Sequence, residues 1–122
     1  MAPDPEDPLA QQLRQLRQEY LRDSGKRVEE LRNLRTRVAQ EGPAALPDLR
    51  QALHRLAGSG GSYGFPDVST RSREAEHLVV NMISTGRSPT AADLAPLDKA
   101  IESVAAAFQD AMRTIGEDEA SS

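Results

Sequence analysis

The sequence predicts an all-α protein, an up-and-down antiparallel four-helix bundle with an additional N-terminal helix. Apolar residues recur at intervals of three and four along most of the chain, and no run of alternating β-branched residues indicates a strand. The connections between these periodic segments are short, which favours antiparallel neighbours. The chain has 122 residues, which corresponds to one domain with one core.

The first expected helix has an apolar stripe on one face, made by Leu9, Leu13, Leu16 and Tyr20, and a break follows at Asp23. The apolar residues of every later helix also gather on one face. A one-sided stripe is stable only when it packs against another element. We therefore expect each helix, the first included, to bury its stripe against the others.

The remaining helices can be placed from their stripes and end signals. The second covers residues 28–38 and ends before a Gly-Pro pair, and the third covers residues 46–63. The fourth begins at Pro66, since proline is tolerated in the first turn of a helix, and its stripe runs to Ile83. Thr90, with an acidic residue three positions later, is a capping signal for the last helix.

The two ends differ in composition from the helical part. Residues 1–8 contain three prolines and three acidic residues, and we expect a disordered lead-in there. Residues 116–122 read GEDEASS, and we expect an acidic disordered tail. The helical domain is thus predicted over residues 9–115.

Composition excludes several classes of function. The chain has no cysteine, so it forms no disulfide and no thiolate metal site. Its formal net charge is -4, whereas a nucleic-acid-binding protein normally has a basic excess. No apolar run approaches the ~20 residues that span a bilayer, and the N-terminus is acidic where a secretory signal would be basic. We expect a cytoplasmic protein that binds neither nucleic acid nor membrane.

One segment of the third expected helix is unusual. Residues 53–65 read LHRLAGSGGSYGF and contain four glycines, although glycine costs about 1 kcal/mol relative to alanine inside a helix. At about 100° per residue, His54 lies roughly 130° from the core-facing side, and Gly58 and Gly61 lie beside it. Bare backbone next to an exposed imidazole suits a nucleophile that must enter the active site of a partner. The alternative is an ordinary surface histidine near a softened helix end.

This segment resembles the histidine-containing phosphotransfer (HPt) domains of bacterial and eukaryotic phosphorelays. Their pattern is a histidine, then an aliphatic residue at +2, usually lysine at +3, glycine at +4, small residues at +5 and +6, and glycine at +10. The residues that match it are His54, Leu56, Gly58, Ser59, Gly60 and Gly64. The resemblance covers residues 9–115. In that family the histidine accepts a phosphoryl group from a receiver-domain aspartate or a histidine kinase and passes it to a response regulator.

The resemblance implies a phosphocarrier rather than an enzyme, because the receiver supplies the catalytic aspartate and the metal ion. It implies no cofactor and no metal site in this chain, and we expect a monomer whose partners are a response-regulator receiver domain, a histidine kinase or both. One position departs from the family, since Ala57 stands where lysine is usual. The alternative function is therefore an HPt-like helical module that binds a signalling partner without phosphotransfer.

The resemblance also implies roles for two further side chains. Glu76 lies 22 residues after His54, where family members often carry a Gln or Glu that hydrogen-bonds the ring. A carboxylate that accepts from Nδ1–H would leave Nε2 free to attack, whereas the alternative is one more solvated charge. The lysine of the family is thought to steady the phosphoryl group. Arg50, one turn before His54, is the candidate to replace it, and its planar fork suits phosphate.

We expect the partner to cover the face around His54, together with flanking positions on the fourth helix. The expected partner-binding residues on the third helix are Gly58, Gly61, Ala57, Arg55 and Ser62. The second histidine, His77, lies on the far side of its helix from the apolar stripe and is interpreted as an ordinary surface residue.

Overall fold

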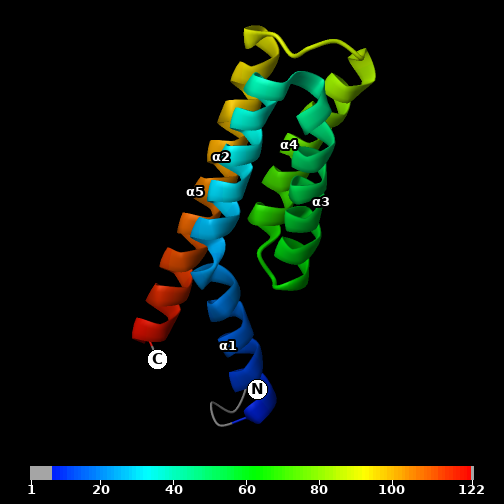
Figure 1. The fold of residues 1–122 in the computed structure, drawn as a ribbon. Helices are drawn as coiled ribbons and strands as arrows, with labels where there is room; N and C mark the ends of the chain where they lie inside the picture. Colours follow the sequence, from blue (N-terminus) through cyan, green and yellow to red (C-terminus); the bar gives the residue numbers. More distant parts are fainter. Residues whose placement is uncertain (1–6, 122) are drawn as a thin grey trace.

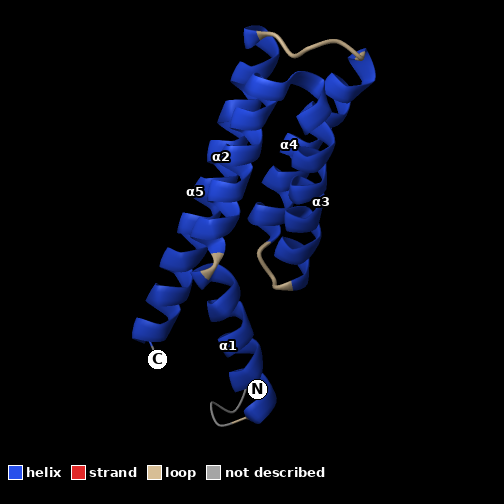
Figure 2. Cartoon of the chain, in the orientation of Figure 1, coloured by secondary structure: helices blue, strands red, loops and turns tan. Residues whose placement is uncertain are grey.

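The computed structural model describes residues 7–121, and these contain helices and short connections but no strand (Figure 2). This confirms the all-α class. The elements in chain order are α1 (Pro8–Arg22), α2 (Ser24–Glu41), a 3-10 turn (Gly42–Ala45), α3 (Leu46–Ser62), α4 (Pro66–Thr85) and α5 (Ala91–Ser121).

Helices α2 to α5 run alternately in opposite directions and lie side by side (Figure 1). The closest packing is between α3 and α4, and α4 in turn packs against α5. Fully buried aliphatic side chains from all four helices fill the core, among them Leu31, Leu53, Val79 and Val104. Burial of this apolar surface is the main force that holds the helices together.

The C-terminal ends of α2 and α4 and the N-terminal end of α5 have residues that are typical of helix termini. Gly42 and Gly86 follow α2 and α4 with positive φ of 75° and 68°, a conformation that only glycine adopts without strain. Before α5, the Thr90 N–H donates to Asp93 Oδ2 at 2.8 Å, and the Asp93 N–H donates to Thr90 Oγ1 at 3.2 Å. This reciprocal pair confirms the capping signal read from the sequence.

The aromatic residues of the chain gather at one end of the packed helices. The Tyr20 ring stacks on Tyr63 with a centroid separation of 4.5 Å and lies 5.9 Å from the rings of both Phe65 and Phe108. The cluster joins the end of α1 to the turn between α3 and α4 and to the middle of α5. It is therefore the point at which α1 is attached to the rest of the fold.

The stripe of α1 is not buried as predicted. Tyr20 is 4% exposed, but Leu16, Leu13 and Leu9 are 41%, 53% and 63% exposed. The reason is that α1 extends beyond the turn that joins α3 and α4, so only its last part reaches the core (Figure 1). The expectation that every helix covers its stripe within the chain is wrong for α1.

The helix boundaries also differ from those expected at the two ends. Helix α1 begins at Pro8, and Asp7 caps it by accepting from the Leu9 N–H at 3.0 Å. The rest of the expected lead-in, residues 1–6, lies outside the described residues. Helix α5 continues to Ser121, because the single Gly116 is not followed by a proline or a second glycine. Only Ser122 of the expected tail lies beyond the described chain.

Within residues 7–121, we find no helix that combines the length and the apolar character needed to cross a membrane.

Candidate functional site

His54 projects from the outer face of α3. Its side chain is 74% exposed, whereas its neighbours Leu53 and Leu56 face the core with 0% and 4% exposure. The apolar pattern of α3 thus fixes the direction of the imidazole, because burying the leucines leaves the histidine outside. A ring in this position is accessible to another macromolecule.

Glu76 of α4 contacts the histidine ring. Its Oε2 lies 3.0 Å from His54 Nδ1, and only 13% of the glutamate side chain is exposed. A carboxylate can only accept, so the contact requires the proton on Nδ1. In the neutral ring the unprotonated nitrogen is then Nε2, which is the nucleophilic atom. The close packing of α3 on α4 therefore selects one tautomer of His54.

Arg50 joins the same carboxylate. Its Nε lies 3.8 Å from Glu76 Oε2, and its side chain is 55% exposed. A hollow of about 320 Å³ opens beside it, lined by Pro47, Arg50, Gln51 and His54. An anion bonded to the ring and lying in this hollow would meet the guanidinium, which is a favourable partner for phosphate oxygens.

The glycines near His54 fall into two kinds. A Cβ built on Gly58 would have no atom within 4 Å, and one on Gly61 would touch only the Ser69 side chain, at 3.6 Å. A Cβ on the buried Gly60 would lie 3.0 Å from the backbone N of Ser69 and 3.0 Å from Val68 Cγ1. Packing of α3 on α4 therefore explains Gly60, whereas nothing inside the molecule requires glycine at 58.

Two of the expected partner-binding residues, Ala57 and Arg55, have contacts within the chain. Ala57 is 5% exposed, and its carbonyl accepts a hydrogen bond from Ser69 Oγ at 2.6 Å, so its methyl group offers almost no surface to a partner. Arg55 faces α2, where it pairs with Glu30 at 3.4 Å. It borders the histidine face on the side away from α4. Ser62 is exposed at the end of α3.

The surface next to the histidine contains two apolar residues that the sequence analysis missed. Val80 and Ile83 of α4 are each 38% exposed. They lie one and two turns after Glu76, so they share its face of the helix. Ile83 was expected in the core stripe of the fourth helix, and that assignment is wrong. Their spacing from Glu76 is the signal that would have identified them.

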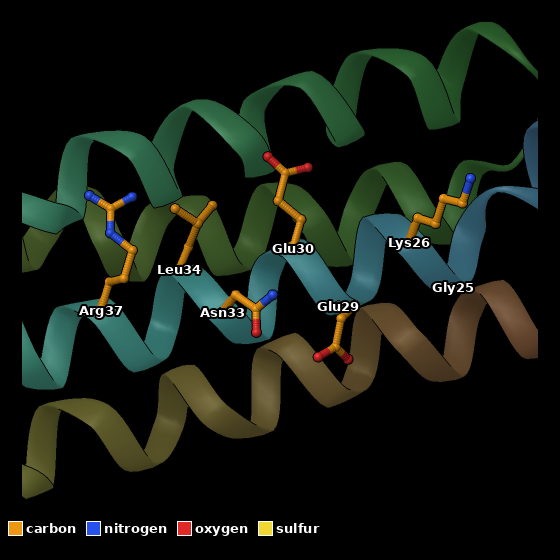
Figure 3. A pocket seen from close by; sticks show the side chains of 7 residues that line it. All are labelled: Gly25, Lys26, Glu29, Glu30, Asn33, Leu34 and Arg37. Carbon is orange, nitrogen blue, oxygen red and sulfur yellow. The ribbon is translucent and has the colours of Figure 1, made fainter.

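The other features of the surface carry less chemistry. His77 is exposed, as expected. An open hollow of about 670 Å³ follows α2 and is lined by Gly25, Lys26, Glu29, Glu30, Asn33, Leu34 and Arg37 (Figure 3). Its charges are partly engaged by α3, since Glu30 pairs with Arg55 and Arg37 pairs with Asp48. Among residues 7–121, no three His, Asp or Glu side chains are grouped so that they could hold a metal ion.

Comparison with protein families adds one finding. The family model described as Hpt domain matches residues 15–113, which is most of the chain and includes all of α2, α3 and α4. Searches of curated proteins and of solved structures found no match.

Proposed function

Because the chain belongs to the Hpt domain family, a family of phosphotransfer domains in two-component signalling, we propose that it carries a phosphoryl group on His54. The donor is a receiver-domain aspartate or a histidine kinase, the acceptor is a response regulator, and the exchange takes place in the cytoplasm. One observation supports this most directly. The imidazole is 74% exposed, and its Nδ1 is engaged by Glu76 at 3.0 Å, which leaves Nε2 free to react.

The step itself is a substitution at phosphorus. The Nε2 lone pair of His54 forms the N–P bond while the O–P bond of the aspartyl phosphate breaks, and the aspartate leaves as a carboxylate. Because the transferring group reacts through a loose transition state, catalysis depends mainly on position and charge. The receiver supplies the metal ion, and this chain supplies an aligned nucleophile. As Nε2 gains phosphorus the ring becomes positive, and the Glu76 carboxylate at Nδ1 stabilises that charge.

Arg50 is the proposed phosphate stabiliser of this chain. It lines the hollow beside His54 and takes the place of the lysine that is usual at Ala57. A phosphoryl group carries close to two negative charges, so a nearby cation favours the phosphorylated state. Arg50 is more than half exposed, which limits the effect to about 1 kcal/mol.

The proposed docking face surrounds the imidazole. On α3 it consists of Gly58 and Gly61, where the backbone is bare, and of the exposed Ser62. On α4 it consists of Val80 and Ile83, which supply apolar surface. The scaffold we propose for it is an up-and-down four-helix bundle of α2 to α5, with α1 as the additional helix. A receiver could approach the glycines closely enough to bring its aspartate to Nε2.

Labelling with a phosphorylated receiver or an active kinase tests this function. The wild type should acquire label that is acid-labile and alkali-stable, as phosphohistidine is. His54→Gln should acquire none while its circular dichroism is unchanged. His77→Gln is the matched control, since it removes the other histidine of the chain, and it should be labelled like the wild type. Label that persists in His54→Gln would exclude the proposed acceptor.

The interaction module remains the second candidate because Ala57 replaces the usual lysine. The same experiment distinguishes the two functions when receiver binding is measured alongside labelling. A phosphocarrier is labelled by at least one receiver that it binds. A module would bind a phosphorylated receiver with equal affinity as wild type and as His54→Gln, and neither protein would acquire label.

A further inference from the structure

Helix α4 packs against α3 in a register that two side-chain contacts define. The two helices are antiparallel and lie side by side (Figure 1). Glu76 Oε2 contacts the His54 ring at one level, and seven residues earlier Ser69 Oγ donates to the Ala57 carbonyl at 2.6 Å. Arg73 is three residues before Glu76 and four after Ser69, so it lies on the same face of α4 between them. The register therefore places Arg73 opposite the part of α3 that follows His54.

The guanidinium group of Arg73 extends along this face toward Ser69. Its Nη2 donates to Ser69 Oγ at 3.4 Å, and the same hydroxyl uses its one proton for the bond to the Ala57 carbonyl. A Cβ on Gly61 would lie 3.6 Å from that hydroxyl, so the guanidinium borders the bare backbone of the docking face. Two hydrogen bonds thus connect Arg73 with the position at which the HPt family usually has its lysine.

The positive charge of Arg73 is available to a new partner. The side chain is exposed, its acceptor Ser69 is uncharged, and a separation of 3.4 Å is long for a hydrogen bond. Arg50 differs, because its Nε lies 3.8 Å from the Glu76 carboxylate. An anion that approaches Arg73 competes only with a neutral hydroxyl, and hydrogen bonds between charged groups are about twice as strong as neutral ones.

Building on the proposed phosphotransfer at His54, we propose that Arg73 binds the phosphoryl group during its exchange with the receiver and shares with Arg50 the role of the family's lysine. While the N–P bond forms at Nε2 and the O–P bond to the receiver aspartate breaks, the Arg73 N–H groups turn from Ser69 and donate to the phosphoryl oxygens. The guanidinium keeps all its protons. Donors aimed at these oxygens stabilise the charge that they carry in the transition state. Arg50 precedes His54 and Arg73 lies opposite the residues that follow it, so the two arginines approach the group from different sides.

Single-turnover transfer from a phosphorylated receiver tests this role. Arg73→Ala and Arg73→Gln should both transfer several-fold more slowly than the wild type. Arg73→Lys keeps the charge and should recover most of the rate, because lysine also binds phosphate. All three should keep the wild-type melting temperature, since the side chain is exposed. Lys99→Ala, which removes an exposed positive charge from α5, is the matched control and should transfer at the wild-type rate.

Receiver binding distinguishes a contact with the phosphoryl group from a contact with the receiver protein. Arg73→Ala should bind the unphosphorylated receiver with wild-type affinity, and an affinity that falls as much as the transfer rate overturns the inference. Wild-type transfer by Arg73→Ala also overturns it, as does slow transfer that Arg73→Lys does not recover. These outcomes leave the phosphocarrier function intact when His54 of the wild type is labelled. Absence of that label with every receiver and kinase overturns the function and this inference together.

Discussion

Glu76 Oε2 lies 3.0 Å from Nδ1 of His54 and 3.8 Å from Nε of Arg50, so one carboxylate oxygen contacts both the imidazole ring and a guanidinium group. The glutamate is 13% exposed, whereas the other two side chains are more than half exposed. Glu76 is therefore the least exposed of the three side chains, which is why we propose that it sets the orientation of the ring.

Removing this carboxylate should slow phosphotransfer without unfolding the protein. We expect Glu76→Ala to lower the rate from a phosphorylated receiver roughly ten-fold, because a hydrogen bond to a charged group contributes 1.5–3 kcal/mol and water replaces part of it. Glu76→Gln keeps an acceptor for Nδ1–H and should lose less. Single-turnover transfer rates measure both effects, and ¹⁵N spectra of the imidazole should show a mixed tautomer only in Glu76→Ala. A Glu76→Ala protein with wild-type rates and a single tautomer would remove Glu76 from the mechanism.

Arg50 should affect the phosphorylation equilibrium of His54 more than it affects the stability of the fold. Arg50→Ala should shift the phosphate from His54 toward the receiver by a few-fold, which corresponds to about 1 kcal/mol. Arg50→Lys keeps the charge and should retain most of the wild-type distribution. The equilibrium between phosphorylated carrier and phosphorylated receiver is the quantity to measure.

Restoring the usual lysine of the family provides a second test of the same idea. Ala57→Lys in the Arg50→Ala background should recover the distribution, provided that the lysine stem passes along α3 from a position that is only 5% exposed. The idea fails if Arg50→Ala leaves the distribution at its wild-type value.

The periodicity of the sequence was sufficient to predict which side of α3 carries His54. It was not sufficient to predict which apolar residues are buried. The 3.6-residue repeat of α3 puts Leu53 inward and His54 outward whatever lies against the helix. The repeat does not show how far a neighbouring helix extends, and so it predicted burial for Leu9 and Leu13, which are 63% and 53% exposed. The apolar pattern of a helix identifies the face that can be buried, whereas the relative lengths of the helices decide which part of that face is covered.

Burial was also predicted wrongly for residues at the borders of the apolar stripes. Ala57 is 5% exposed and its carbonyl accepts from Ser69 Oγ of α4 at 2.6 Å, whereas Ile83 is 38% exposed. Both residues lie at the border of an apolar stripe, where a small rotation of one helix against another changes the outcome. Such rotations depend on close contacts such as that of Gly60 with Val68, which one sequence alone does not reveal.

The two kinds of glycine in α3 allow a matched pair of substitutions. Gly58→Gln should leave stability unchanged or raise it by roughly 0.5 kcal/mol, since the position is open and glutamine is the better helix former. It should nevertheless prevent phosphotransfer, because its side chain occupies the docking face beside His54. Gly60→Gln should instead destabilise the fold by about 2–4 kcal/mol, because its Cβ would meet backbone at 3.0 Å. Urea unfolding and transfer assays on both variants measure these effects, and normal transfer by Gly58→Gln would contradict the docking face.

The tyrosine that anchors α1 should make the protein sensitive to alkaline pH. Burial raises the pKa of the Tyr20 phenol, while the hydrogen bond to Ser59 opposes this in part. Below about pH 10 both folded and unfolded chains keep the proton, so stability is unaffected. Above it the unfolded chain releases the proton first, and the free energy of unfolding should fall until the pH passes the raised pKa of the folded state. Urea unfolding between about pH 8 and pH 11 measures how steeply the free energy of unfolding falls with pH.

Tyr20→Phe should lower the free energy of unfolding by about 1 kcal/mol at neutral pH, through the missing hydrogen bond, and this free energy should fall less steeply at alkaline pH. Tyr63→Phe, at a position that is 36% exposed in the same cluster, is the control and should retain the decline. An equal slope in wild type and Tyr20→Phe would show that the phenol of Tyr20 is not the group responsible.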